Sequence, residues 1–597
     1  MPAPRSSFVF ASALAVLAFA TACDSNKSTN SPNGKGKAKA GSTVEPFVFD
    51  DPFPDEAAVE AIAARPAPEL TQMFGEPESP VDHWTMHGAG AQRTPAAAYE
   101  DGDRASELAA EAFASKDEAR TVSPGLQCAA AEFGHFALAH GAEPAADVRG
   151  FILARCGSLV TNITFSIDLI EPKRAPKSAF TTPQLRGLFA RVADSFPPDA
   201  HVGLWAGRSD QGGAVVRVYG QPRMVLEPVP LASGKTGYVE LRGEMQWDAQ
   251  SIVGYATVGE QGYSICKRSP GTNEQAPRFA LRCRVDPNDE RAMIELQATP
   301  RGRIMSRRAL QLIVSPKGSV PDDYQAPQLS LPIGDERDGT AWATAVTALR
   351  RSAELSSVSL SVGQTDVAQS LLPHLLAALR NSGQAELLDQ IAMGLIAGRK
   401  IDEDVGSGTF FFSTVPRAWT LERELAAVLQ SPHARSKIFD PDLSTLAVAS
   451  LANEEGQMRS SVIAGYTVLR DRDYSWEIAA FFDAVDRHRV ARGLEPVIRV
   501  EGPNDRKVLE AYAGRVRAGE IAPSEALDAL LDHFVEEAKR DFHGIMFSPY
   551  AFLGWEPQLE GTLVEAERVA AAVTITHFVP DGAAWGRYLV LVTYTKL

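Results

Sequence analysis

Cysteine is scarce in this chain of 597 residues, with only five, and none of them belongs to a CxxC pair. The eleven histidines do not cluster either, so the sequence lacks the pattern of a structural zinc site. The motifs HExxH and GxSxG and the phosphate-binding P-loop are also missing. The sequence therefore gives no motif evidence that the chain is a zincin, an α/β-hydrolase or a nucleotidase.

Positive charge is also in deficit, because the formal net charge is −16. Such a surface repels phosphate backbones, so no nucleic-acid partner is expected. Beyond the N-terminal segment, no apolar run is long enough to cross a bilayer. With 45% hydrophobic residues, a chain of this length predicts several domains with buried cores.

The N-terminus has the features of an export signal. Arg5 precedes an apolar run over residues 8–20, which is too short for a membrane span. The run ends in Ala20-Thr21-Ala22-Cys23, which resembles the lipobox of bacterial lipoproteins. The resemblance implies a signal peptide over 1–23 and lipid attachment at Cys23. An ordinary A-x-A cleavage site beside an incidental cysteine is the alternative.

The other four cysteines predict two disulfides in an oxidising compartment. Four cysteines allow three pairings, and proximity in the chain favours Cys128–Cys156 and Cys266–Cys283. Each bridge would close a short loop and contribute roughly 3 kcal/mol on the loop-entropy model.

Composition and periodicity divide the chain after residue 23 into regions with different predicted folds. The fold class is α+β and multidomain. The predicted divisions are a flexible tether and irregular region over 24–100, an α+β domain over 101–220, a β-sandwich of Ig-like architecture over 221–316, a proline-rich linker over 317–334, and two α/β units over 335–470 and 475–597.

In the last two regions, helical patterns precede a closing pair of apolar strands. A basic segment and an Asp-Pro turn are predicted over 432–441. Helices are predicted over 341–355, 367–379, 386–397, 422–429, 476–491, 505–518 and 524–540, and strands over 446–452, 460–469, 569–578 and 586–595.

Two segments resemble the motifs of CAP domains, the SCP-like secreted superfamily. Residues 431–441 (SPHARSKIFDP) are similar to the pattern S-P-G-H-R-x-x-I-L-[ND]-P, and residues 486–496 (DRHRVARGLEP) to N-x-x-R-x-x-x-G-L-x-P. The matched positions that we single out are Ser431, Pro432, Arg435, Arg489 and Gly493, with His433 beside them. The resemblance implies two degenerate CAP-like units, each an α/β/α sandwich, and leaves 101–220 open as a third.

The departures from the family pattern concern its chemistry. In CAP domains, His and Glu side chains line a cavity that can hold a divalent metal. Here Ala434 stands where the motif has His, and His433 is one residue away, a rotation of roughly 100° on a helix. Arg399 stands near where a Glu would be expected. We therefore expect neither metal nor cofactor, and predict that His433 is a surface or helix-end residue.

The expected function is non-catalytic. The chain would be a membrane-anchored lipoprotein of the bacterial cell envelope, facing the periplasm or the exterior, that binds or scaffolds a lipid, a glycan or another protein. The alternative is a metal-dependent hydrolase acting on envelope peptides or glycans, with His433 and His543 as its candidate residues.

Overall fold

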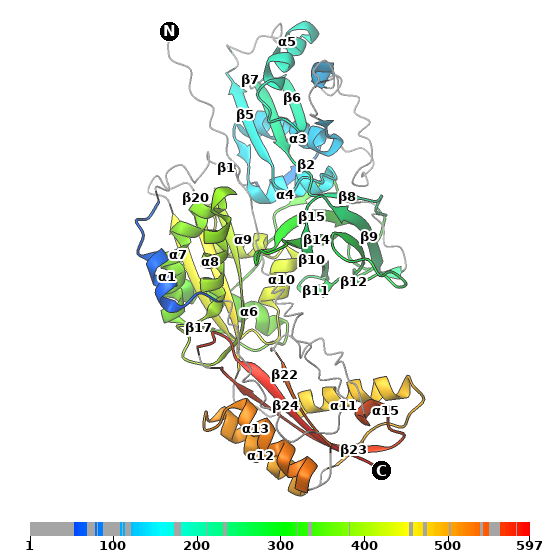
Figure 1. Cartoon of the computed structure of the whole chain (residues 1–597). Helices are drawn as coiled ribbons and strands as arrows, with labels where there is room; N and C mark the ends of the chain where they lie inside the picture. Colours follow the sequence, from blue (N-terminus) through cyan, green and yellow to red (C-terminus); the bar gives the residue numbers. More distant parts are fainter. Residues whose placement is uncertain are drawn as a thin grey trace. The chain divides into compact units, whose positions relative to one another are not determined.

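The computed structural model describes the chain from residue 53 onward, except for 69–77, 80, 88–107, 110, 114–120, 172, 174–180, 211, 231–235, 319, 332–336, 381, 453–457, 470–473, 501–502, 538–540, 548–561 and 581. The expected export signal and Cys23 lie outside these residues. Two compact units are present, Val59–Leu395 with Thr409–Gly465, and Ile396–Gly408 with Tyr466–Leu597. The fold is mixed α+β (Figure 1). Among the described helices, none is both long and apolar enough to cross a membrane.

Three four-stranded sheets have the same topology, although they lie in different predicted regions of the chain (101–220, 335–470 and 475–597). In chain order, the strands lie first–third–fourth–second, and the first has two residues and runs parallel to the third. The sheets consist of β3 (Thr121–Val122), β6 (His201–Ser209), β7 (Gly212–Gly220) and β5 (Thr164–Ile170); β17 (Ser359–Leu360), β19 (Thr445–Ala452), β20 (Met458–Val468) and β18 (Val405–Pro416); and β21 (Ile498–Arg499), β23 (Val569–Phe578), β24 (Arg587–Lys596) and β22 (Asp541–Phe547).

The helices also recur in the same order around these sheets. Because the first and third strands are parallel, the chain between them must cross over, and helices fill the crossover. Two helices follow each short strand, and one or two more precede the closing hairpin. They are α3 (Pro124–His140), α4 (Ala146–Arg155) and α5 (Thr182–Ala193); α7 (Val362–Arg380), α8 (Ala385–Ala397), α9 (Leu421–Val428) and α10 (Pro432–Ile438); and α12 (Pro503–Arg517), α13 (Pro523–Leu531) and α15 (Thr562–Glu565). The last two sheets are also preceded by α6 (Gly339–Ser352) and α11 (Ser475–Val490).

The C-terminal sheet is covered by helices on both faces (Figure 1). On β23, Ala571 and Val573 pack with α11 and α15, whereas Ala572 and Phe578 pack with α12 and α13. Burial on both faces explains why the strand is apolar at successive positions instead of alternating.

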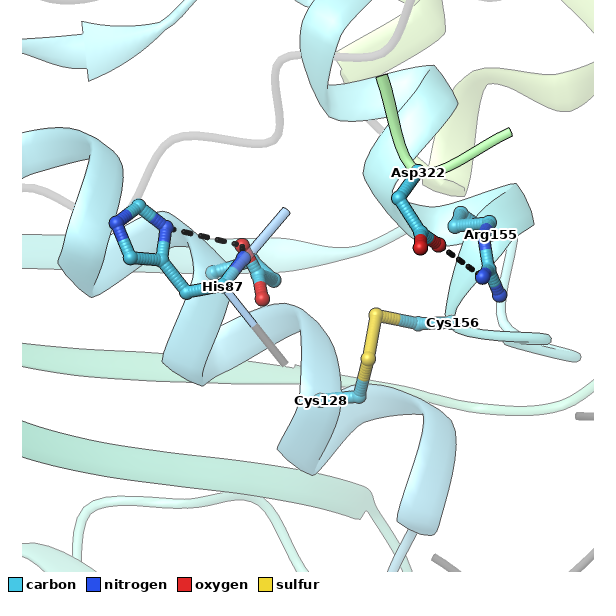
Figure 2. The surroundings of a disulfide bond; sticks show 6 residues. His87, Cys128, Arg155, Cys156 and Asp322 are labelled. Atoms are coloured by element: carbon cyan, nitrogen blue, oxygen red, sulfur yellow. Dashed lines mark hydrogen bonds and ion pairs between the residues drawn. A yellow bond between two sulfur atoms is a disulfide. The ribbon is translucent and has the colours of Figure 1, made fainter. Parts of the chain in front are cut away.

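Two further sheets enclose one core and form a β-sandwich. The first consists of β11 (Gly262–Ile265), β10 (Ala249–Val258), β14 (Ala292–Pro300) and β15 (Arg307–Val314), and the second of β12 (Lys267–Arg268), β13 (Arg278–Arg284), β9 (Tyr238–Met245) and β8 (Met224–Leu226). Cys266 and Cys283 form a disulfide in this core, as predicted. The second predicted disulfide is also present: Cys128 on α3 is bonded to Cys156 after α4 (Figure 2).

The segment predicted as a proline-rich linker contains ordered, buried residues. Its strand β16 (Asp323–Gln325) pairs with β2 (His83–Thr85), and Tyr324 is buried in the core of the α3 region. Tyr324 donates a hydrogen bond to Asp147 on α4, and Arg155 pairs with Asp322 (Figure 2). The pattern of prolines in 317–334 did not reveal these contacts.

Most predicted helices and closing strands are present within a few residues of their predicted bounds. Residues 432–438, predicted only as a basic segment, form the helix α10. The predicted Asp440-Pro441 turn is confirmed, since the Leu443 N–H donates to the Asp440 carbonyl at 3.1 Å. The predicted helix over 524–540 is instead α13 followed by a π-helical stretch, Asp532–Glu537. The sequence analysis did not predict β22 or the three short edge strands.

Candidate functional site

Ser431 and Pro432 explain why α10 begins where it does. Ser431 is the N-cap, and its Oγ accepts a hydrogen bond from the backbone N–H of Ala434 at 3.2 Å. Pro432 occupies the first turn, where a missing N–H costs nothing. The same Ser431 hydroxyl donates to Oε2 of Glu295 on β14 at 2.6 Å. The cap therefore also joins the helix to the β-sandwich.

Glu295 is fully buried on the face of β14 that points away from the sandwich core, since its neighbours Ile294 and Leu296 lie in that core. Arg308 Nε donates to its Oε1 at 3.0 Å, and Gln297 donates to the same oxygen. A buried carboxylate needs such a counter-charge and donors to offset its lost hydration.

Arg435 makes a second connection to the sandwich. Its Nη1 donates to the carbonyls of Gly259 at 3.0 Å and Gly262 at 3.1 Å, which flank the turn between β10 and β11. Its Nε donates to the carbonyl of Leu429 at 2.7 Å, before α10. Burial lowers the pKa of Arg435 to about 10, so the guanidinium keeps its charge at neutral pH.

His433 is fully buried, so it is not a surface residue, whereas its predicted place at a helix end is confirmed, because it is the second residue of α10. Its ring meets Tyr255 of β10 edge-on, with centroids 4.7 Å apart. Among the described residues, neither ring nitrogen has a hydrogen-bond partner. Burial, then the nearby charges of Lys437 and Arg308, hold the pKa of His433 well below its usual range. The imidazole is therefore neutral and serves as a packing group. We call the contact formed by Tyr255, Glu295, Ser431, His433 and Arg435 the module joint.

Arg489, from the motif over 486–496, is fully buried and hydrogen-bonds the backbone. Its guanidinium donates to the carbonyls of Glu495 at 2.7 Å, Leu563 at 2.8 Å and Glu567 at 3.2 Å. Gly493 has a φ of +76°, the left-handed conformation that favours glycine at the end of a helix. These two motif residues hold α11 to the segment that enters the closing hairpin.

The sequence analysis missed the counterpart of Arg489 in the preceding region. Arg350, at the end of α6, is also fully buried and donates to the carbonyls of Ser356, Ile438, Asp440 and Leu443 at 2.7–3.0 Å. The spacing R-x-x-x-x-L was the available signal, since the N–H five residues on bonds the arginine carbonyl in both helices. It was hidden because Glu354, with a φ of +60°, stands where glycine is found at 493.

Histidines also gather beside α3, away from the predicted motifs. His87 stacks on His135 with centroids 4.5 Å apart, and its Nδ1 lies 3.9 Å from Oε2 of buried Glu132 (Figure 2). The in-plane lone pairs of two parallel rings do not converge on one point. Within the part of the chain that is described, no group of three His, Cys, Asp or Glu residues could hold a metal ion. His543, the other candidate, lies on β22 opposite Val592.

Buried His577 of β23 lies between two other polar groups that the sequence analysis did not bring together. Its Nδ1 hydrogen-bonds the hydroxyl of Tyr474, and its Nε2 lies 3.6 Å from Oδ2 of Asp404. Tyr474 is buried, whereas Asp404 is 51% exposed. A nucleophile–His–acid site needs the opposite order, because the hydroxyl must meet the substrate. The group instead connects residues 396–408 to the C-terminal sheet.

The structure thus divides the predicted motif residues between two structural roles. Ser431, Pro432, His433 and Arg435 belong to α10 at the module joint, and Arg489 with Gly493 ends α11. No family model matches the chain, and no curated protein matches it. The functional proposal therefore rests on geometry.

Proposed function

We propose that this chain is an exported bacterial lipoprotein of the cell envelope, in which degenerate CAP-like units and an Ig-like β-sandwich form a non-catalytic binding or scaffolding protein. The observation that carries the proposal is the state of His433. It is fully buried against Tyr255, with neither ring nitrogen bonded to a described residue. A side chain enclosed in this way cannot meet a substrate.

The rest of the module joint supports a scaffolding role. Ser431 and Arg435 both donate to groups of the β-sandwich. A buried polar group is costly unless it is hydrogen-bonded, so these contacts favour one arrangement of α10 on the sheet. The segment that resembles the CAP motif thus holds α10 against the neighbouring β-sandwich, as a scaffold requires.

Two further observations agree with the proposed location outside the cytosol and with the proposed domain architecture. The disulfides Cys128–Cys156 and Cys266–Cys283 are of the kind that persists outside the reducing cytosol. The strand order of the sheet within 101–220 matches that of the other two, which supports a third CAP-like unit. In this proposal, Cys23 carries the lipid that anchors the protein, and the ligand is a lipid, a glycan or another protein.

Cell fractionation tests the anchor. We expect Cys23→Ser to move the protein from the membrane fraction to the soluble fraction. A Cys128→Ser/Cys156→Ser variant, which loses two cysteines but keeps Cys23, is the control and should stay in the membrane fraction. Unchanged fractionation of the Cys23 variant would show that the lipoprotein assignment is wrong.

Zinc binding tests the non-catalytic assignment against the hydrolase alternative. We expect no stoichiometric binding at micromolar zinc by the purified chain, and the same result for His433→Phe and His543→Phe. Tight binding of one zinc ion that either substitution abolishes would favour the hydrolase and overturn the scaffolding proposal.

A further inference from the structure

The β-sandwich has a cationic surface, although the chain as a whole carries a net charge of −16. We define the basic patch as Lys267 of β12 with Arg282 and Arg284 of β13, which share one face of the sheet. Within the described chain, no carboxylate lies within ion-pair distance of any of these three cations. Glu240, opposite Arg282, is instead paired with Arg242 at 3.5 Å.

The sheet holds two of these cations against each other. Lys267 and Arg282 are direct cross-strand partners, and like charges in such positions repel. The adjacent cysteines, Cys266 and Cys283, are joined by a disulfide that keeps the two strands together. The protein thus keeps two like charges side by side, and the carboxylate opposite Arg282, Glu240, is shared with Arg242. An anionic partner would relieve this repulsion.

Apolar side chains border the basic patch. Tyr238 is 39% exposed and lies opposite Arg284, with the guanidinium of Arg282 3.9 Å from its ring centroid. Ile265, two residues before Lys267, is 55% exposed. A hydrogen bond of 2.7 Å from the Ser264 hydroxyl to the Arg284 carbonyl places this segment beside β13. Cations next to an exposed aromatic and an exposed aliphatic side chain are typical of surfaces that lie at a membrane interface.

We propose that the basic patch binds the anionic headgroups of a phospholipid membrane, with Tyr238 and Ile265 entering the interface between headgroups and acyl chains. The inference rests on the proposed lipoprotein function, because an anchored chain stays within reach of such a surface. The exposed aliphatic side chain favours lipid over an anionic glycan, which would gain nothing from it. A described cavity on the same sheet is lined by Glu227, Glu244 and Glu274 as well as by arginines, so it does not extend the cationic surface.

Vesicle co-sedimentation tests the inference. The full chain with Cys23→Ser is mixed with vesicles of phosphatidylcholine alone or with added phosphatidylglycerol, so that binding through the N-terminal apolar segment appears in both. We expect tighter binding to the anionic vesicles, weakened by salt. Lys267→Gln/Arg282→Gln should weaken that binding about 25-fold, from a factor of about five for each cation near an anionic surface.

The matched control is Arg278→Gln/Arg301→Gln, which removes the same charge from the same domain at exposed, ion-paired positions. We expect this control to lose less than about threefold, since its cations are already neutralised by Glu244 and Asp248. Equal losses for both variants, or no preference for anionic vesicles, would overturn the proposal. So would binding to dextran sulfate that depends on Lys267 and Arg282 without binding to vesicles. Fractionation of the Cys23 variant tests the lipid anchor separately. A negative vesicle experiment would therefore overturn the proposal for the basic patch without contradicting the proposed lipid anchor.

Discussion

The helices α6 and α11 precede sheets of the same strand order, and each ends in a buried arginine. Arg350 and Arg489 both donate to backbone carbonyls of the segment that enters the closing hairpin. That segment differs between the two regions. The first contains α10, with seven residues, and the second contains α15, with four.

The environment of these two short helices also differs. α10 packs on β10, β11 and β14 of the sandwich, through the module joint. α15 packs within its own region, on α11 and β23. The comparison indicates that the buried arginine maintains the fold in both regions, whereas the S-P-x-x-R pattern is present where the β-sandwich covers the helix.

Replacing the buried arginines should have the largest effect on stability. Arg350→Met and Arg489→Met keep much of the side-chain volume but leave several buried carbonyls without a donor. Each should destabilise its own region by about 3 kcal/mol or more. Arg350→Met should have the larger effect, because Arg350 donates to four carbonyls within 3.0 Å and Arg489 to two.

Hydrogen exchange measured by peptide separates the two regions, which a global melting curve would mix. Arg350→Met should accelerate exchange in β19 and leave β23 unchanged, and Arg489→Met should do the reverse. Unchanged protection in both strands would mean that the two arginines do not maintain these regions.

A smaller effect is expected from pH at the module joint. Burial depresses the pKa of His433, so the folded state binds a proton less readily than the unfolded state. The folded state is therefore not penalised above the unfolded-state pKa of His433, about 6.5. As the pH falls below that value, the free energy of unfolding decreases by up to about 1.4 kcal/mol per pH unit. α15 itself contains no histidine, so this helix has no counterpart of His433.

The measurement is hydrogen exchange in α10 at pH 7 and pH 5, corrected for the intrinsic exchange rate. His433→Phe keeps a ring against Tyr255 and should remove the acid-induced loss of protection. His83→Phe alters an exposed imidazole and is the control. If the variant and the parent lose protection equally, His433 is not the titrating group.

The smallest effects should have opposite signs at the two helix ends. Glu354 has a φ of +60°, which is strained for a residue with a Cβ, so Glu354→Gly should stabilise its region by about 1 kcal/mol. Gly493→Ala should destabilise the other by about 1 kcal/mol through backbone strain alone, since nothing lies within 4 Å of the added Cβ. Exchange rates at the ends of α6 and α11 would measure both, and equal signs would refute the correspondence.

Local patterns predicted the regular elements well. The apolar period of the helices and the continuous apolar runs of β23 and β24 carry their own evidence, because burial of a face dictates residue type along a segment. The edge strands β17 and β21 have only two residues each, too few for any period. α10 was missed because a helix of seven residues that is buried nearly all round has no polar face to mark it.

The candidate site was less predictable than the fold. Ser431 and Arg435 were identified as motif residues, but their partners, Glu295 and the carbonyls of Gly259 and Gly262, lie more than 130 residues away in the chain. Likewise, no local pattern links Tyr474 to His577, which are 103 residues apart. Spacing can show that a residue is unusual, but the group that it faces depends on which modules pack together.

The sequence by itself determined most of the longer helices and the closing strands, and it favoured the pairing of Cys128 with Cys156 and of Cys266 with Cys283. These follow from local periodicity and from short separations along the chain. Only the tertiary structure decided that His433 is enclosed and that Arg350 is the counterpart of Arg489. Burial and hydrogen bonding are properties of pairs of distant segments, and the free energy that determines them is gained when those segments meet.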